Sequence, residues 1–308
     1  MTPNPAVVLG TRGSKLALVQ SETCAGRLGA AGIEVEILII KTTSEHHPDT
    51  PLAVIDQRDV FTRQLDEALL GGRIDLAVHS LKDVPTELPD GIALAAFTER
   101  HDPSDALISE ERYTVDDLPR GAVVATSSLR RRAQLLHRRP DLEIVAIRGN
   151  VDTRVRKMHA GAADAVVLAR AGLERLGLYA PHTVIPPDVV LPAVGQGALA
   201  AATLEDHPLR DRIREVLNHE PTEKAVRAER AMLHALEGGC RVPVGASSVF
   251  EGSAVWLRGV VASPDGALVY RGEARGEEPE EVGRRLARDL LEQGAAVVLG
   301  EIREVRSR

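Results

Sequence analysis

The strongest constraint in this sequence is a regular alternation of short apolar runs and longer amphipathic segments over the first two thirds of the chain. Residues 6–10, 33–40, 75–79 and 92–97 have the composition of buried strands, and helical periodicity lies between them. Strands that alternate with helices form βαβ units, whose strands pair in parallel because each helix carries the chain back across the sheet. The run at 33–40 becomes continuously apolar, which predicts a strand buried on both faces.

A second series with the same organisation follows. Residues 123–125, 142–147 and 165–169 predict strands, and Ser127 or Ser128 is the expected cap of a helix that reaches residue 138. Two similar α/β halves in tandem commonly bind a ligand at the carboxyl ends of their strands. The sequence therefore predicts an α/β fold with two doubly wound domains.

The last third of the chain has a different pattern. Residues 221–236 predict a long helix with proline in its first turn. The strand patterns at 255–261 and 267–271 are separated by Pro264-Asp265-Gly266, which is a hairpin signal. With a final helix at 280–291, this part predicts a smaller α+β domain with an antiparallel sheet.

Composition excludes several classes of protein. No apolar run is long enough to span a bilayer, and residues 1–6 lack the basic and apolar pattern of a signal peptide, so we expect a cytoplasmic protein outside the membrane. Two cysteines in 308 residues are too few for a disulfide scaffold, which fits a reducing compartment. Aromatic residues make up 2%, which argues against base stacking on single-stranded nucleic acid.

Positive charge is concentrated in one segment of an acidic chain. The formal net charge is −7, yet residues 126–158 contain nine basic and three acidic side chains. The basic residues are Arg130, Arg131, Arg132, Arg138, Arg139, Arg148, Arg154, Arg156 and Lys157. Such an island is either a solvated helix face or a site for a polyanionic ligand.

Three predicted strands are followed by polar residues where a helix should begin. These are Thr11-Arg12-Gly13-Ser14, residues 126–131 and Arg148-Gly149-Asn150. A helix N-terminus offers free N–H groups, and arginine adds bidentate binding of carboxylates. Each segment alone could be an ordinary helix cap, but three together predict a site for several carboxylates.

Two further positions allow two interpretations each. Asp83 is either the partner of Lys82 in a surface ion pair or a carboxylate that faces the ligand and stabilises a developing cation. Cys240, between Gly238-Gly239 and Arg241, is either an inert thiol or an accessible nucleophile. No cysteine or histidine spacing is that of a metal site, so no metal is expected.

The sequence resembles the porphobilinogen deaminase (hydroxymethylbilane synthase) family over essentially its whole length. The motifs that carry the resemblance are residues 11–14, 77–85, 126–131, 148–151, 191–197 and 237–243. The resemblance implies two domains like periplasmic anion-binding proteins and a third domain that carries the cofactor. The implied boundaries are 1–98 with 199–216, then 104–192, then 220–308.

The resemblance also implies a reaction and a cofactor. A dipyrromethane would be joined to Cys240 by a thioether. Four porphobilinogen molecules would be condensed head to tail through azafulvenes with release of ammonia, and hydrolysis would release hydroxymethylbilane for tetrapyrrole (haem, porphyrin) biosynthesis. The implied enzyme is a monomeric transferase whose partner is its small-molecule substrate.

Individual residues receive roles from the matching motifs. Asp83 would be the catalytic carboxylate, and Lys82 beside it would be a second catalytic residue. The residues implied to bind the cofactor are Cys240, Ser80, Lys82, Asp83, Thr126, Ser127, Ser128, Arg130, Arg131, Arg148, Gly149 and Asn150. Those implied to bind substrate are Arg12, Ser14, Gln20, Arg148, Arg154, Arg175 and Gln196. Arg58 and Phe61 would belong to a lid.

One segment departs from the family pattern, because Asp56-Gln57-Arg58-Asp59 stands where the family usually has a glycine-rich lid. Two alternatives to the enzyme stay open. The atypical lid suggests a divergent paralogue with the same fold and altered turnover. The expected likeness of the first two domains to periplasmic proteins suggests a non-enzymatic anion-binding module, which the lack of a signal peptide pattern and the position of Cys240 disfavour. Nucleic-acid binding through the basic island is disfavoured by the acidic net charge.

Overall fold

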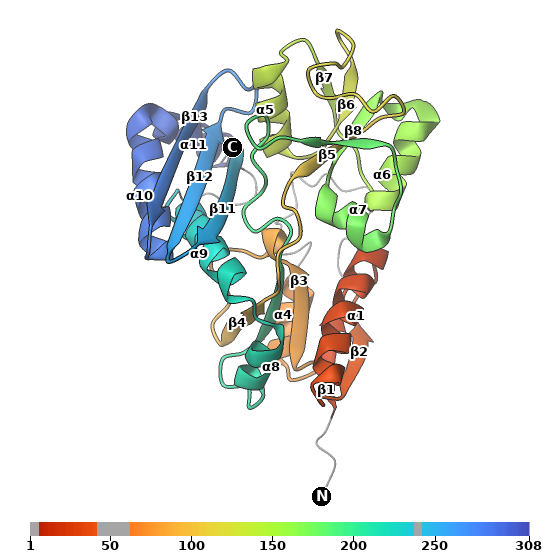
Figure 1. Cartoon of the computed structure of the whole chain (residues 1–308), viewed down its shortest axis with the longest axis vertical. Helices are drawn as coiled ribbons and strands as arrows, with labels where there is room; N and C mark the ends of the chain where they lie inside the picture. The colour runs from red at the N-terminus through yellow and green to blue at the C-terminus, as the bar shows by residue number, and fades with distance from the viewer. Residues whose placement is uncertain (1–5, 42–61, 237–241, 308) are drawn as a thin grey trace, which may run out of the picture. The chain divides into compact units, whose positions relative to one another are not determined.

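The computed structural model describes residues 6–41, 62–236 and 242–307, with side chains to residue 302 (Figure 1). The chain divides into two compact units, and each unit contains two separate stretches of sequence. The first unit is Met1–Arg100 with Ala198–Glu223, and the second is His101–Gly197 with Lys224–Arg308. The chain therefore passes between the units three times.

The first unit is built on a five-stranded sheet with the order β2-β1-β3-β10-β4. Its strands are β1 (Val7–Thr11), β2 (Val35–Ile39), β3 (Leu76–Ser80), β4 (Ile92–Phe97) and β10 (Leu199–Leu204). β1 pairs in parallel with β2 and β3, whereas β10 is antiparallel to both of its neighbours. The sheet is largely parallel, as the alternating pattern predicts, and its one reversed strand arrives from a distant part of the chain.

Helices cover both faces of this sheet. They are α1 (Lys15–Ala30), α4 (Arg63–Leu70) and α8 (Arg210–Leu217). Leu28 of α1 and Ile213 of α8 pack in one apolar cluster with Leu9 of β1. Leu65 of α4 packs in another cluster with Val8, the neighbour of Leu9 in the strand. Since neighbouring residues of a strand point to opposite faces, the unit is doubly wound as predicted.

The prediction for β2 is wrong in one respect. Leu38 and Ile39 are 37% and 51% exposed among the described residues, although the apolar run predicts burial on both faces. Among the described strands, β2 lies at the edge of the sheet and has β1 as its one partner. The apolar run at 33–40 therefore indicates a strand, but it does not indicate that this strand lies at the centre of the sheet.

The second unit contains a sheet of the same plan, with the order β7-β6-β8-β5-β9. Its strands are β5 (Asp105–Ile108), β6 (Val123–Ala125), β7 (Glu143–Val145), β8 (Ala165–Ala169) and β9 (His182–Ile185). Its helices are α5 (Leu129–Arg138), α6 (Val151–Lys157) with a following π turn, Met158–Ala162, and α7 (Arg170–Leu176). β5 is the reversed strand, antiparallel to β8 and β9. The sequence patterns predict neither β5 nor β9, because both are short and begin with a polar residue.

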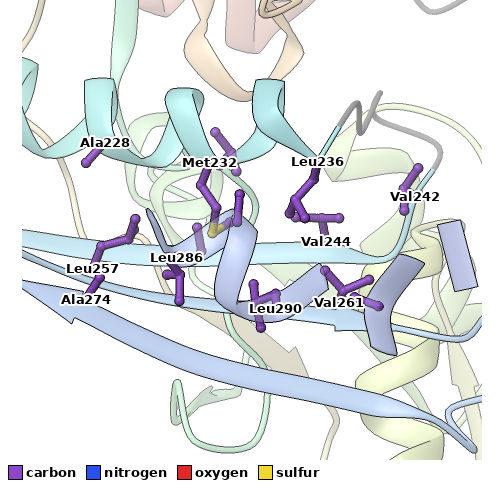
Figure 2. Close-up of a cluster of buried hydrophobic side chains, with 14 of the residues drawn as sticks. Ala228, Met232, Leu236, Val242, Val244, Leu257, Val261, Ala274, Leu286 and Leu290 are labelled. Atoms are coloured by element: carbon purple, nitrogen blue, oxygen red, sulfur yellow. The ribbon is translucent and has the colours of Figure 1, made fainter. Parts of the chain in front are cut away.

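The same unit includes a smaller antiparallel sheet of β11 (Val244–Glu251), β12 (Ala254–Ala262) and β13 (Val269–Gly276), in the order β11-β12-β13. The helical elements of this part are α9 (Glu220–Ala235), which begins in the first unit, α10 (Pro279–Leu290), a π turn at Leu291–Ala295 and α11 (Ala296–Ser307). Figure 2 shows Met232 of α9 and Leu236, which directly follows α9, in one core cluster with Leu257 and Leu286. These elements confirm the predicted α+β part and, with the two larger sheets, the predicted fold class.

In the described part of the chain, none of the helices combines the length and the apolar character that a membrane span requires.

Candidate functional site

The first group of predicted site residues lies at one edge of the sheet in the first unit. β1 and β3 are parallel neighbours, so the residues that follow them come to the same edge. Arg12 directly follows β1, and Ser80 ends β3. Lys82 and Asp83 come next, in a single 3₁₀ turn (Leu81–Asp83). Leu81 is 1% exposed and its N–H donates to Ala198 O at 3.0 Å, which fixes this turn against the sheet.

Two residues of α1 belong to this group. Ser14 is the N-cap of α1 and accepts a hydrogen bond from Ala17 N at 3.3 Å. Gln20 is 4% exposed, and its Nε2 donates to Ser80 Oγ at 2.9 Å. The structure thus joins Gln20 to Ser80, and it places Arg12 and Ser14 in the segment between β1 and α1 at the same edge of the sheet.

His79 is a buried neighbour of this group. It is 6% exposed. Its burial, with a smaller contribution from the positive charge of Arg12, lowers the pKa of His79 to about 4. The imidazole is therefore neutral at physiological pH.

The second group lies in the second unit, where two loops follow the parallel strands β6 and β7. Ser127 Oγ donates to Ile147 O at 2.7 Å and accepts from Ile147 N at 3.1 Å, so one hydroxyl joins the two loops. Thr126 Oγ1 accepts from Ser128 N at 3.2 Å. Ser128 caps α5 by accepting from Arg131 N at 3.4 Å. The predicted helix cap is confirmed at Ser128.

The loop after β7 depends on a glycine. Gly149 has φ +110°, and a Cβ there would lie 2.6 Å from Thr153 Cγ2. Asn150 is the N-cap of α6 and makes no side-chain capping bond. Arg154 Nε donates to Gly149 O at 2.7 Å. Arg148 is half-buried, and its carbonyl oxygen accepts a hydrogen bond from Lys157 Nζ at 3.1 Å. The helix thus begins with a basic, glycine-dependent turn.

Arg130 and Arg131 share one buried carboxylate. Arg130 Nη1 donates to Asp105 Oδ2 at 2.7 Å, and Arg131 Nη2 donates to Asp105 Oδ1 at 2.7 Å. Arg130 also donates to Leu191 O at 2.6 Å, and Arg131 donates to Val167 O at 2.9 Å. The three charged side chains are at most 6% exposed.

This cluster keeps an excess of positive charge. Burial alone would raise the pKa of Asp105, but the charges of Arg130 and Arg131 outweigh it and hold the pKa well below its usual range. One ionised carboxylate therefore faces two guanidinium groups. Arg131 Nε is also buried without a hydrogen-bond partner among the described residues. A second anion would satisfy both the charge and the donor.

Gln196 and Arg175 complete the group in the second unit. Gln196 is 1% exposed, and its Nε2 donates to Asp105 Oδ1 at 2.8 Å and to Pro103 O at 2.6 Å. Arg175 Nη2 donates to Gly197 O at 2.5 Å. Gln196 therefore helps to hold Asp105 in place. The contact of Gln196 with substrate stays a prediction.

Sequence reasoning missed Asp105 and Gln134, which pair with the predicted arginines and with the segment after Val190. The available signal was an aspartate at the start of an apolar run, Asp105–Ile108. Cys240, Arg58 and Phe61 lie outside the described residues. Within those residues, no cluster of three or more His, Cys, Asp or Glu side chains is placed to bind a metal.

Comparison with known proteins gives consistent matches. Residues 7–211 match the family model described as porphobilinogen deaminase, dipyromethane cofactor binding domain, and residues 224–292 match porphobilinogen deaminase, C-terminal domain. A porphobilinogen deaminase of Rubrobacter xylanophilus is 69% identical over 300 residues, which cover 97% of this chain and 98% of that protein. One of Syntrophomonas wolfei is 46% identical over 301 residues, covering 96% and 98%. Among solved structures, a periplasmic substrate-binding protein of an ABC transporter from Coxiella burnetii is 18% identical with a TM-score of 0.43, covering 72% of this chain and 94% of that one.

Proposed function

Because the chain belongs to the porphobilinogen deaminase family, we propose that it is a transferase that joins four porphobilinogen molecules head to tail into hydroxymethylbilane. At each addition the carbon–nitrogen bond of porphobilinogen breaks, ammonia leaves, and a carbon–carbon bond forms to the growing chain with loss of its α-proton. Water then releases the tetrapyrrole. The observation that carries this proposal is the match of residues 7–211 to the cofactor-binding domain of the family.

A covalently attached dipyrromethane supplies the free α-carbon at which the chain grows. The attachment residue is Cys240. Leu236 and Val242, the described residues nearest to it in sequence, are 1% and 7% exposed and pack in the same apolar cluster (Figure 2). This packing supports a fixed position for both flanks of the attachment segment.

The residues of the second unit fit a carboxylate-bearing cofactor. Asp105 neutralises only one of the two guanidinium groups of Arg130 and Arg131, and Arg131 Nε has no partner among the described residues. A cofactor carboxylate would complete this donor set. The other residues proposed to hold the cofactor are Ser80, Lys82, Thr126, Ser127, Ser128, Arg148, Gly149 and Asn150.

Asp83 is the proposed catalytic carboxylate. Its short turn is held by the buried Leu81, so that its position is set by the sheet edge next to Arg12. An ionised carboxylate accepts hydrogen bonds from pyrrole N–H groups and stabilises the positive charge that develops as ammonia leaves. Lys82 beside it is the second proposed catalytic residue. The residues proposed to bind substrate are Arg12, Ser14, Gln20, Arg148, Arg154, Arg175 and Gln196.

The proposed domains are 1–98 with 199–216, then 104–192, then 220–308. The three separate sheets support this division, each with its own apolar clusters. We place the enzyme in the cytoplasm as a monomer. The two cysteines in 308 residues support a reducing compartment, and the net charge of −7 supports a small-molecule substrate rather than nucleic acid.

The intact mass of the purified protein, followed by an assay with porphobilinogen, tests this function. We expect a mass increase of two pyrrole units, absent from Cys240→Ser, and consumption of porphobilinogen by the wild type. Cys24→Ser is the matched control and should keep the added mass. A loaded protein without turnover would support the divergent paralogue, and a wild type that never carries the group would support the anion-binding module.

A further inference from the structure

The segment 186–197 contains the Leu-Pro-Ala-Val-Gly-Gln-Gly motif, and Gln196 is its one residue with a role in the reaction proposed above. Its centre is held by one buried side chain, Gln134 of α5, which is 1% exposed. Gln134 Oε1 accepts from Leu191 N at 2.9 Å, and its Nε2 donates to Leu191 O at 3.1 Å. Arg130 Nη1 donates to the same carbonyl at 2.6 Å. The segment is therefore fixed to the helix that bears the arginine pair.

The same segment is also bound to the small antiparallel sheet. Arg271 Nη2 of β13 lies 3.3 Å from both Gln134 Oε1 and Val189 O, to which it donates. Ala246 N of β11 donates to Pro192 O at 2.9 Å. A Cβ on Gly245 would lie 2.8 Å from Leu191 O, so the two backbones touch. The segment 186–197 thus lies between α5 and this sheet.

A third contact joins the segment to the helix that leads toward Cys240. Gly195 N donates to Glu229 Oε2 of α9 at 2.7 Å. The other oxygen of Glu229 accepts from Ser248 N at 2.9 Å and from Ser248 Oγ at 2.7 Å, and Glu229 is 0% exposed. Leu236, near the end of the same helix, packs in the core beside Val242.

We propose that Gln134 and Arg271 are positioning residues, which use the segment 186–197 to fix Arg130 and Arg131 relative to the elements that flank Cys240. The inference rests on the proposed function, in which the cofactor is attached at Cys240 and its carboxylates bind near the arginines. The distance between the arginine pair and the elements that flank Cys240 must stay constant if the reacting carbon of the cofactor is to meet the substrate. A displacement of about 1 Å at a reacting centre can reduce a rate on the order of 10²-fold.

The test compares Gln134→Met, Arg271→Gln and Arg271→Lys with the control Arg275→Gln. The methionine of Gln134→Met has nearly the size of glutamine but makes none of its hydrogen bonds. The lysine of Arg271→Lys keeps the positive charge and can donate to one of the two acceptors of Arg271. Arg275 is an exposed residue of β13 on the same face as Arg271. Intact mass gives cofactor occupancy, thermal unfolding gives stability, and the mass of the enzyme during one turnover gives the rate of the first porphobilinogen addition per loaded molecule.

We expect Gln134→Met to keep its cofactor and to slow the first addition on the order of 10²-fold, with KM within about threefold of the wild type. Arg271→Gln should slow it about tenfold, Arg271→Lys should recover part of that loss, and Arg275→Gln should stay within about twofold. Variants that lose thermal stability but add porphobilinogen at the wild-type rate per loaded molecule would overturn the positioning role. A wild type without cofactor or turnover would overturn the proposed function as well, so the wild-type measurement distinguishes the two failures.

Discussion

Asp105 accepts a hydrogen bond from Arg131 Nη2 at 2.7 Å, and the two side chains are 0% and 6% exposed. The same carboxylate binds Arg130 through its other oxygen. Two neighbouring cations on α5 can be buried together only because this strand residue lies between them. Asp105 is therefore the residue on which the arginine pair depends.

Asp105→Asn should destabilise the protein by about 3–5 kcal/mol, because it leaves buried guanidinium groups without their counter-charge. Urea unfolding monitored by circular dichroism measures the difference. Asp116→Asn is the control, since Asp116 pairs with Arg138 on the surface, and it should have a much smaller effect. Equal losses in the two variants would contradict a special role for Asp105.

Asp83→Asn should keep the fold and the cofactor and lower kcat about 10²–10⁴-fold. The amide has nearly the same shape but carries no charge with which to stabilise the cation that forms as ammonia leaves. Steady-state consumption of porphobilinogen measures the effect. Asp90→Asn, at an exposed position of the same unit, should retain its activity. Turnover of Asp83→Asn within about threefold of the wild type would refute the role.

Gly149→Ala should destabilise the turn that begins α6 and raise KM for porphobilinogen. Its φ of +110° is strained for alanine, and the new Cβ would lie 2.6 Å from Thr153 Cγ2. Strain of this kind costs on the order of 1–3 kcal/mol. Gly161→Ala is a matched control, because it has φ +83° but open space around a Cβ. If both variants unfold at the same temperature with unchanged KM, the close contact with Thr153 has no functional consequence.

His79 should make stability depend on pH between about 6.5 and 4. Its folded pKa is lowered from 6.5 to about 4, so the unfolded chain takes up a proton first as the pH falls. The folded state therefore loses stability across this window, by about 3 kcal/mol in total, and is unaffected above it. His79→Gln should remove the dependence in chemical unfolding at pH 7, 6, 5 and 4.5. Asp105 acts in a different range, because its pKa is below the ordinary aspartate value and its contribution is lost only at more acidic pH. An unchanged slope in His79→Gln would show that other groups cause the acid sensitivity.

The end of α5 shows how tertiary structure changes an interpretation of sequence. Arg138 and Arg139 both stand near the end of a helix, just before Pro140, and their sequence position predicts two exposed residues. Arg138 is exposed, but Arg139 binds Asp141 and donates to backbone carbonyls that include Val115 O at 3.0 Å. Only Arg138 is therefore a suitable surface control for Arg131.

Local sequence patterns predict most of the helices and strands and the kinds of residue at the site. Hydrophobic period is a local property, so it predicts α1, α5 and β12 within a few residues, whereas the pattern at 267–271 covers only the first part of β13. Helix caps such as Ser14 and Ser128 are local as well, because each accepts its bond from a residue three positions later. The matching motifs added the family, its cofactor and its reaction.

Contacts between distant residues, in contrast, depend on the tertiary fold. β10 joins the first sheet after the chain has formed most of the second unit. Asp105 binds two arginines that lie more than twenty positions away in the sequence. Gln134 pairs with Leu191 in the same way. No local periodicity predicts such pairs, because they depend on the order of the strands in each sheet. They also depend on the requirement that a buried charge or amide has a hydrogen-bond partner, which can come from any part of the chain.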